Sequence, residues 1–215
     1  MPIINKLTTG FTHFRDKYFS QHQELYRSLV REGQKPTICM IACADSRVDP
    51  AIVLDAEPGD IFAIRNVANM VPPYQGDQDV TYHGTSAALE FAVQYLGVKY
   101  IVVFGHAHCA GVKAMVNGQE GQAVAGHFVP AWTSIADRAY AMARTKNPTA
   151  EGAELVRCCE RQSVLVSLEN LMTFPFIKDK VEAGTLHIHG WYLDIAEGKL
   201  AQYDPATDTF VTMAA

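Results

Sequence analysis

Two short stretches of this sequence follow apolar runs with side chains that could do chemistry. The first stretch, "MIACADSRVDP", covers residues 40–50 and places Cys43, Asp45 and Arg47 at alternate positions. Such a stretch offers a sulfur ligand for a metal, with a hydrogen-bond acceptor and a cation beside it. A buried cysteine followed by a surface Asp–Arg pair in a turn fits equally well, because short motifs often arise by chance.

The second stretch, "FGHAHCAGV", covers residues 104–112 and presents two histidines and a cysteine after another apolar run. Ligands of open parallel sheets bind just beyond the carboxyl ends of the strands. If the two strands are neighbours, Cys43 and His106 lie close together, and the opening turn of the next helix brings Cys109 to the same point. We favour His106 over His108 as the ligand, because the residue directly before Cys109 points elsewhere on a helix.

The three residues Cys43, His106 and Cys109 predict a zinc site. Thiolate and imidazole groups are common zinc ligands, and three protein ligands leave a fourth position open, as in catalytic sites. Cys158 and Cys159 fall within a predicted helix. We interpret them as core or helix-surface residues, because free cysteine behaves as a small hydrophobic residue.

Predicted helices and strands alternate along the chain around these motifs. Strands are expected at 37–44, 61–68, 99–105 and 185–195, and helices at 5–32, 50–55, 80–97, 108–116, 127–145 and 151–171. This order predicts the α/β fold class, with a mostly parallel central β-sheet flanked by helices. A long N-terminal helix precedes the sheet, and a C-terminal hairpin over residues 185–204 extends one edge.

The composition indicates one globular domain. The chain has 215 residues, of which 48% are hydrophobic and 19% are charged, and its net charge is −5. We expect a single domain over residues 1–215, with residues 1–35 as an N-terminal helical arm. No segment concentrates Lys and Arg, and no apolar stretch approaches the roughly 20 residues of a membrane span. Neither nucleic acid nor membrane is therefore an expected partner.

The cysteines and the N-terminus predict a cytoplasmic location. The chain has 5 cysteines, and this odd count, with two of them adjacent, argues against a disulfide framework. The first residues lack the basic start and apolar run of a signal peptide. A reducing compartment is the expected setting for such a sequence.

Taken together, the Cys-x-Asp-x-Arg and His-x-x-Cys motifs resemble those of the β-class carbonic anhydrases. The resemblance extends over about residues 30–205 and includes "EPGDIFAIRNVAN", "GTSAALEFAV" and "IVVFGHAHCAGV". It implies an α/β fold, a homo-oligomer (a dimer or a dimer of dimers), and one Zn²⁺ per chain. The implied reaction is the reversible hydration of carbon dioxide to bicarbonate, by attack of zinc-bound hydroxide.

The resemblance implies roles for particular positions. Cys43, His106 and Cys109 correspond to the zinc ligands, and Asp45 and Arg47 to the catalytic dyad. Asp45 would accept a hydrogen bond from the zinc-bound hydroxide, and Arg47 would keep that carboxylate ionised. In the family the substrate pocket forms partly across a dimer interface, and its residues correspond here to Gln34, Phe62, Val67 and Phe91.

The sequence also departs from one branch of the family. Met40 stands where a regulated branch carries a tryptophan beside a non-catalytic bicarbonate site. The missing tryptophan and the presence of Gln34 favour the open-site, plant-like branch, but Arg65 is retained, so the regulatory site stays an open question. Because two thiolates cancel the charge of zinc, we also expect activity to rise with alkalinity.

Two further expectations concern the partner and the alternatives. The first helix has more apolar positions than one face of a small domain needs, including Phe11, Phe14, Tyr18 and Phe19. We expect it to pack across a partner subunit, as the resemblance also implies. Relatives on the same scaffold hydrolyse carbonyl sulfide or carbon disulfide, and this activity stays an alternative. A non-catalytic zinc-binding protein is a second alternative, and its mark would be a lost dyad or a fourth protein ligand.

Overall fold

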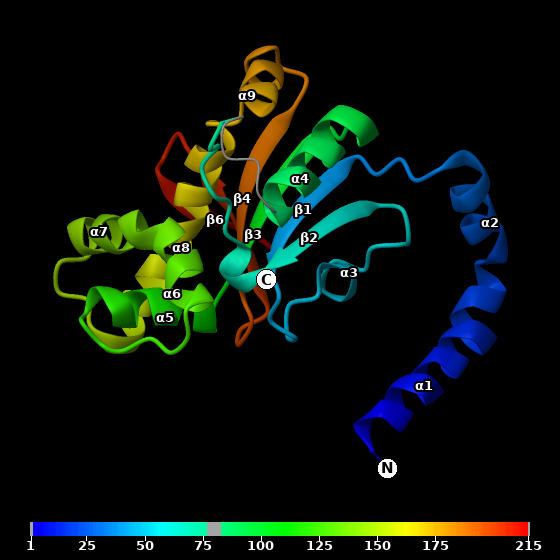
Figure 1. Cartoon of the computed structure of the whole chain (residues 1–215), viewed down its shortest axis with the longest axis horizontal. Coiled ribbons are helices and arrows are strands. Elements are labelled where there is room, and N and C mark those ends of the chain that lie inside the picture. Colours follow the sequence, from blue (N-terminus) through cyan, green and yellow to red (C-terminus); the bar gives the residue numbers. More distant parts are fainter. Residues whose placement is uncertain (1, 77–82, 215) are drawn as a thin grey trace.

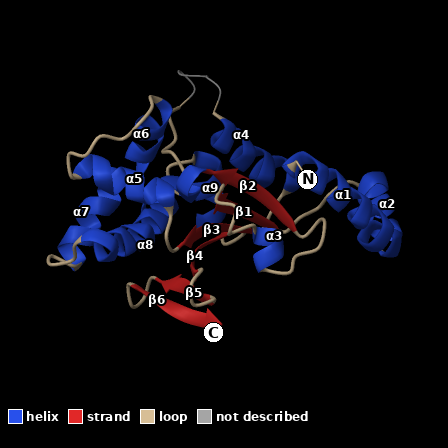
Figure 2. Cartoon of the chain, turned by 90° about the horizontal axis from the view of Figure 1, so that it is seen from below, coloured by secondary structure: helices blue, strands red, loops and turns tan. Residues whose placement is uncertain are grey.

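The computed structural model describes residues 2–76 and 83–214 of the chain. Within these residues, six strands form one sheet in the order β2-β1-β3-β4-β5-β6 (Figure 1). Their bounds are β1 Ile38–Cys43, β2 Ile61–Asn66, β3 Tyr100–His106, β4 His187–Asp194, β5 Lys199–Asp204 and β6 Thr209–Ala214. The first four strands pair in parallel, and β5 and β6 add two antiparallel strands at one edge (Figure 2). The predicted α/β class with a mostly parallel sheet is confirmed.

Helices cover both faces of this sheet (Figure 1). One face packs against α5 Ala110–Gln119, α7 Asp137–Lys146 and part of α8 Gly152–Leu171. The other face packs against α4 Gly84–Glu90, the π-helix η3 Phe91–Leu96 and α9 Pro175–Glu182. The remaining short elements are α3 Pro50–Val53, the 3-10 turn η2 Val67–Asn69, α6 Phe128–Thr133 and the 3-10 turn η4 Ser134–Ala136.

The continuous apolar run in β1 follows from burial on both faces. Met40 and Ala42 face the layer of α5, α7 and α8, whereas Cys39 and Ile41 face the layer of α4 and α9. All four side chains are buried. A strand with two covered faces needs apolar residues at successive positions rather than at alternate ones.

The structure divides the predicted first helix. It consists of α1 Ile3–His13, the π-helix η1 Phe14–Phe19 and α2 Gln23–Glu32, with a bend at His22. The bend brings the ring of Tyr26 to 6.0 Å from that of Phe14 and 5.1 Å from that of Phe19. In a straight helix, residues 14 and 26 would be about 18 Å apart. Aromatic packing across the bend at His22 therefore stabilises the divided arrangement over one straight helix.

Other departures are smaller. The predicted helix over 127–145 is three elements, α6, η4 and α7. The predicted helix over 80–97 corresponds to α4 and η3, and its residues 80–82 lie outside the described part of the chain. The sequence patterns did not predict α9, which begins with a proline at its first turn, or the edge strand β6.

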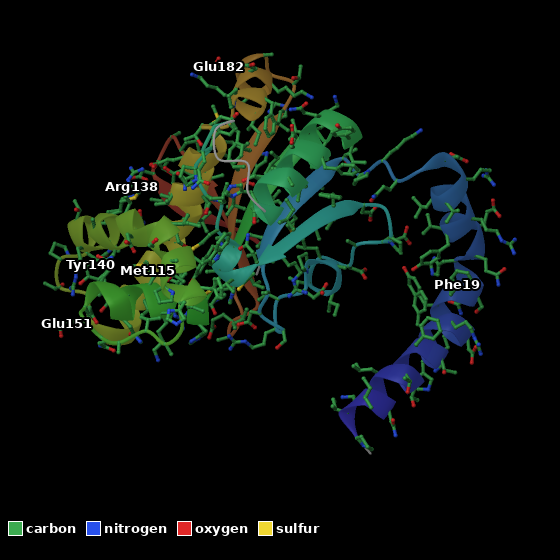
Figure 3. The ribbon with its side chains drawn as sticks, in the orientation of Figure 1. Phe19, Met115, Arg138, Tyr140, Glu151 and Glu182 are labelled. Carbon is green, nitrogen blue, oxygen red and sulfur yellow. The ribbon has the colours of Figure 1, made fainter. Side chains whose placement is uncertain are left out.

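The N-terminal arm, residues 3–32, extends away from the body of the molecule (Figures 1 and 3). None of its side chains is buried. Its exposed large apolar residues are Ile3, Ile4, Leu7, Phe11, Phe14, Tyr18 and Val30. Contiguous exposed apolar surface of this kind marks an interaction site in most soluble proteins. In the described part of the chain, no helix is both long and apolar enough to cross a bilayer.

Candidate metal centre

The carboxyl ends of β1 and β3 carry the three predicted ligands. The two strands are parallel neighbours, and the register pairs Ala42 with Phe104. Cys43 ends β1, His106 ends β3, and Cys109 caps the N-terminus of α5. Their ligand atoms all lie within 4.8 Å of one another, and all three residues are buried. The structure thus brings together side chains that are 66 residues apart in sequence.

The geometry of this cluster fits a zinc ion. The sulfurs of Cys43 and Cys109 are 4.0 Å apart. Tetrahedral zinc with Zn–S bonds of about 2.3 Å separates two sulfurs by about 3.8 Å. The Nδ1 atom of His106 lies 2.8 Å from the Ala107 carbonyl oxygen and donates its proton there. This leaves the lone pair on Nε2, which is buried and has no partner among the described residues. An orphaned nitrogen beside two sulfurs is the donor set that zinc prefers.

The sulfurs of Cys43 and Cys109 are close enough to hydrogen-bond to each other. The pKa of Cys43 is lowered to about 4, chiefly because the Cys109 thiol donates a hydrogen bond to its sulfur. Burial opposes this shift, and the Ala68 backbone N–H, 3.3 Å from the sulfur, adds to it. The pKa of Cys109 is raised by the same hydrogen bond and by burial. A divalent cation would bind both sulfurs as thiolates, so metal affinity should rise with pH.

Asp45 and Arg47 form a two-pronged ion pair beside the cluster. The Nε and Nη2 atoms of Arg47 donate to the two carboxylate oxygens of Asp45 at 2.9 and 2.7 Å, and its backbone N–H donates at 2.9 Å. These hydrogen bonds hold the pKa of Asp45 well below its usual range. Among the described residues, the group that could hold a metal comprises Cys43, His106 and Cys109, without Asp45. In this structure the Asp45 carboxylate therefore pairs with Arg47 and does not belong to the metal cluster.

Arg65, on β2, stabilises the loop that follows Cys43 by three hydrogen bonds. Its Nε donates to the Cys43 carbonyl at 3.1 Å, its Nη2 to the Asp45 carbonyl at 2.8 Å, and its Nη1 to the Asp49 carboxylate at 2.7 Å. The sequence left open whether Arg65 belongs to a bicarbonate site. In this structure all three guanidinium nitrogens are engaged by the protein.

The turn after β2 supports the cluster from the other side. Ala68 and Asn69 have φ of 64° and 49°, a left-handed conformation that is uncommon for residues other than glycine. In this turn the Ala68 N–H donates to the Cys43 sulfur at 3.3 Å. A Cβ atom at Gly111 would lie 2.8 Å from a Val67 methyl group and 2.9 Å from the Ala68 Cβ. Glycine at that position therefore allows α5 to pack closely against the turn.

The predicted substrate pocket is not assembled within one chain. Val67 lies in the turn beside the cluster. Phe62 pairs with Cys39, four residues before the ligand end of β1, which is about 13 Å along the strand. Its ring is 5.9 Å from that of Phe91. Gln34 is exposed and precedes β1, so it also lies toward the opposite end of the sheet from the ligands.

Glu160 is a site residue that the sequence analysis did not single out. It lies on α8 with only 1% exposure. Its Oε1 accepts a hydrogen bond from the Cys109 backbone N–H at 2.9 Å, and its Oε2 accepts one from the Tyr192 hydroxyl at 2.7 Å. Burial raises the pKa of this carboxyl group, and both hydrogen bonds oppose the shift. The sequence carried one sign of this buried role. Glu160 is four residues from both Val156 and Val164, so it lies on an apolar stripe of the predicted helix.

Comparison with known proteins agrees with this geometry. The sequence model of the carbonic anhydrase family matches residues 38–200. A carbonic anhydrase of Synechocystis sp. is 34% identical over 208 residues, which cover 97% of this chain and 74% of that relative. The solved structure of the β-carbonic anhydrase CcaA matches with a TM-score of 0.91 and 33% identity, over 100% of this chain and 94% of that chain. A tetrameric β-carbonic anhydrase of Sordaria macrospora matches with a TM-score of 0.81 and 27% identity, over 94% of this chain and 97% of that chain.

These matches cover the sheet, its helices and both motifs. The chain therefore belongs to the carbonic anhydrase family, in its β class. Membership at this level of similarity identifies it as an enzyme with carbonic anhydrase activity.

Proposed function

We propose that this enzyme catalyses the zinc-dependent, reversible hydration of carbon dioxide to bicarbonate and a proton. The observation that carries the proposal is the buried group of Cys43, His106 and Cys109 with an orphaned imidazole nitrogen, next to a carboxylate held by an arginine. Three ligands leave one position for a small molecule. When bound there, zinc supplies a water molecule that loses its proton more readily than bulk water.

The protein's own contribution is orientation. Asp45 can accept a hydrogen bond from a group in the open position, because Arg47 keeps the carboxylate ionised and fixes its direction. An apolar cavity of about 420 Å³ lies beside the turn that supports Cys43 and is lined by Asn66, Val67, Gly84, Thr85, Phe128, Val129 and Trp132. The Trp132 Nε1 donates to the Val67 carbonyl at 2.7 Å and fixes this wall. Carbon dioxide is apolar and small, and such a cavity suits it.

We assign the enzyme to the open-site branch of its class. Asp45 pairs with Arg47 rather than joining the metal ligands. The Arg65 guanidinium already donates to the Cys43 and Asp45 carbonyls and to the Asp49 carboxylate, which favours a structural role over the binding of a regulatory anion. The five cysteines are free thiols, which suits a reducing cytoplasm.

We propose that the active unit is a homodimer, alone or paired into a tetramer. In one chain Val67 lies beside the ligands, whereas Phe62 and Phe91 lie together elsewhere. A second copy could supply the missing aromatic wall. Apolar side chains in both places are exposed and available to a second copy: Phe91 and Val67 are each 42% exposed, and Phe128, which lines the same cavity as Val67, is 88% exposed. The matched enzymes of Sordaria macrospora are tetrameric.

Deleting residues 1–25 should convert the protein to monomers with poor activity. The arm contributes exposed apolar side chains that its own chain does not cover. We expect light scattering coupled to size-exclusion chromatography to show the mass of one chain. The substitutions Phe11→Ser and Phe14→Ser in the full-length chain should weaken association in the same direction. A truncated protein that remains a fully active dimer would show that the arm is dispensable.

A panel of three substrates tests the reaction itself. We expect rapid hydration of carbon dioxide and little hydrolysis of carbonyl sulfide or carbon disulfide. Preferential turnover of either sulfur compound would favour the alternative hydrolase. Zinc uptake without turnover of any of the three would favour a non-catalytic zinc-binding protein.

A further inference from the structure

His108 has an unusual backbone conformation between two of the metal-site residues. It lies between Ala107 and Cys109 and has φ of 59°, in the left-handed region. Its carbonyl oxygen accepts a hydrogen bond from Arg47 Nη2 at 3.0 Å. The same nitrogen donates to Asp45 Oδ2 at 2.7 Å. The orientation of the Arg47 guanidinium therefore depends on where His108 places its carbonyl group.

The side chain of His108 is held by Arg157 from α8. The Nη2 atom of Arg157 lies within hydrogen-bond distance of the His108 ring nitrogens. Arg157 is in turn flanked by two carboxylates, with Nη1 3.8 Å from Asp194 Oδ2 and Nε 3.9 Å from Glu160 Oε2. These partners come from β4 and from α8 itself, both of which pack in the body of the fold. Both carboxylates lie within ion-pair distance and favour the guanidinium in this place beside the His108 loop.

We propose that Arg157 is a positioning residue for the Asp45–Arg47 dyad and that it acts through His108. It fixes the His108 ring, the ring fixes the loop, and the loop carbonyl fixes Arg47. The inference rests on the proposed function, because the dyad matters only if it orients a group at the metal. Such outer partners commonly change affinity or activity by about 10- to 100-fold.

If Arg157 only stabilised the fold, its removal would lower stability without a specific effect at the metal. The Arg157 side chain is 30% exposed and belongs to neither apolar cluster, so its loss removes no packing from the apolar core. A loosened Arg47 would instead hold Asp45 less firmly. The Asp45 carboxylate, two residues from Cys43, would then compete for the open position at the metal. The expected effect is a change in the metal's fourth position rather than a general loss of stability.

The test uses full-length protein loaded with Co²⁺, whose visible absorption reports the ligands, titrated with thiocyanate. We expect Arg157→Ala to weaken thiocyanate binding about 10-fold and to change the spectrum before any anion is added. Arg138→Ala is the matched control. Arg138, labelled in Figure 3, is exposed and pairs with Glu169, which belongs to neither the metal cluster nor the dyad, and its removal changes the charge equally. An unchanged dissociation constant in Arg157→Ala would overturn the proposal.

A double-mutant cycle tests whether the effect passes through His108. Asparagine tolerates the left-handed conformation, so His108→Asn removes the ring while keeping the backbone. In that background Arg157→Ala should weaken thiocyanate binding by less than about 2-fold, because coupled residues are not additive. A full 10-fold loss there would contradict the pathway. If Arg157→Ala does not fold, Arg157→Lys replaces it, because lysine keeps the charge but lacks the planar guanidinium. This variant should also raise the thiocyanate dissociation constant. An unchanged constant would contradict the proposal.

The outcomes separate this inference from the proposed function. Protein that takes up no cobalt, or cobalt- and zinc-loaded protein that hydrates no carbon dioxide, would contradict the function. Cobalt uptake with identical spectra and thiocyanate affinities in wild type and Arg157→Ala would contradict only the role of Arg157.

Discussion

Replacing Cys43 or Cys109 by alanine should remove the zinc and abolish catalysis. Each substitution leaves two of three ligands, and each also removes the hydrogen bond that the two thiols share. We expect zinc to fall from about one ion per chain to less than about one-tenth, because affinity depends on a complete, deprotonated ligand set. Elemental analysis after dialysis against a weak chelator measures this directly.

The control for that experiment is Cys158→Ala. Cys158 is a free thiol on α8 that is outside the metal cluster, so its removal should leave zinc content and hydration rate unchanged. Full zinc occupancy in both ligand variants would contradict the assignment of Cys43 and Cys109. Thermal unfolding of each variant should accompany the analysis, since loss of bound metal lowers the apparent stability of the fold.

Arg47→Ala should retain zinc but lose most of the activity, by about 100-fold. Arg47 supplies three hydrogen bonds to the Asp45 carboxylate. The pKa of Asp45 is depressed by this partner, so without it the pKa rises toward its ordinary value of about 4. Asp45 would still be ionised at pH 8, and the loss would therefore come from orientation rather than from protonation. Hydration rates and zinc content measured on the same sample test both parts.

The pH dependence of stability provides a second measurement on Arg47→Ala. A carboxyl group with a depressed pKa stabilises the folded state above its ordinary pKa, and this contribution disappears as pH falls through the folded-state pKa. Wild type and variant should therefore differ in stability near neutral pH and converge under acid conditions.

Arg47→Lys keeps the positive charge but not the planar guanidinium, so it should recover only part of the activity. A near-wild-type rate for Arg47→Ala would contradict the role of the dyad.

The sequence predicted the metal cluster because parallel strands place their carboxyl ends together. Cys43 and His106 directly end two apolar runs, and only neighbouring strands were needed to bring them into contact. The spacing from His106 to Cys109 then required only a turn and the start of a helix. Topology and local spacing were sufficient for these three residues.

The supporting residues depend on features that periodicity does not show. Glu160 reaches Cys109 because of the rotation of α8 about its axis, and the two residues are 51 apart in sequence. The Ala68 N–H that donates to Cys43 lies in a turn where two consecutive residues adopt the left-handed conformation. Phe62 and Phe91 were predicted as pocket residues by resemblance, and within one chain they lie together near the opposite end of β1 from the ligands. Only tertiary and quaternary packing decide these contacts.

The most direct test of the account is a zinc titration followed by stopped-flow hydration of carbon dioxide. Protein stripped with a chelator should be inactive near pH 8, and the rate should rise linearly with added Zn²⁺ until one ion is bound per chain. Mg²⁺ should not restore it, because thiolate and imidazole ligands suit zinc rather than a hard cation. Carbon dioxide hydration that persists undiminished in protein shown to contain no metal would contradict the central claim.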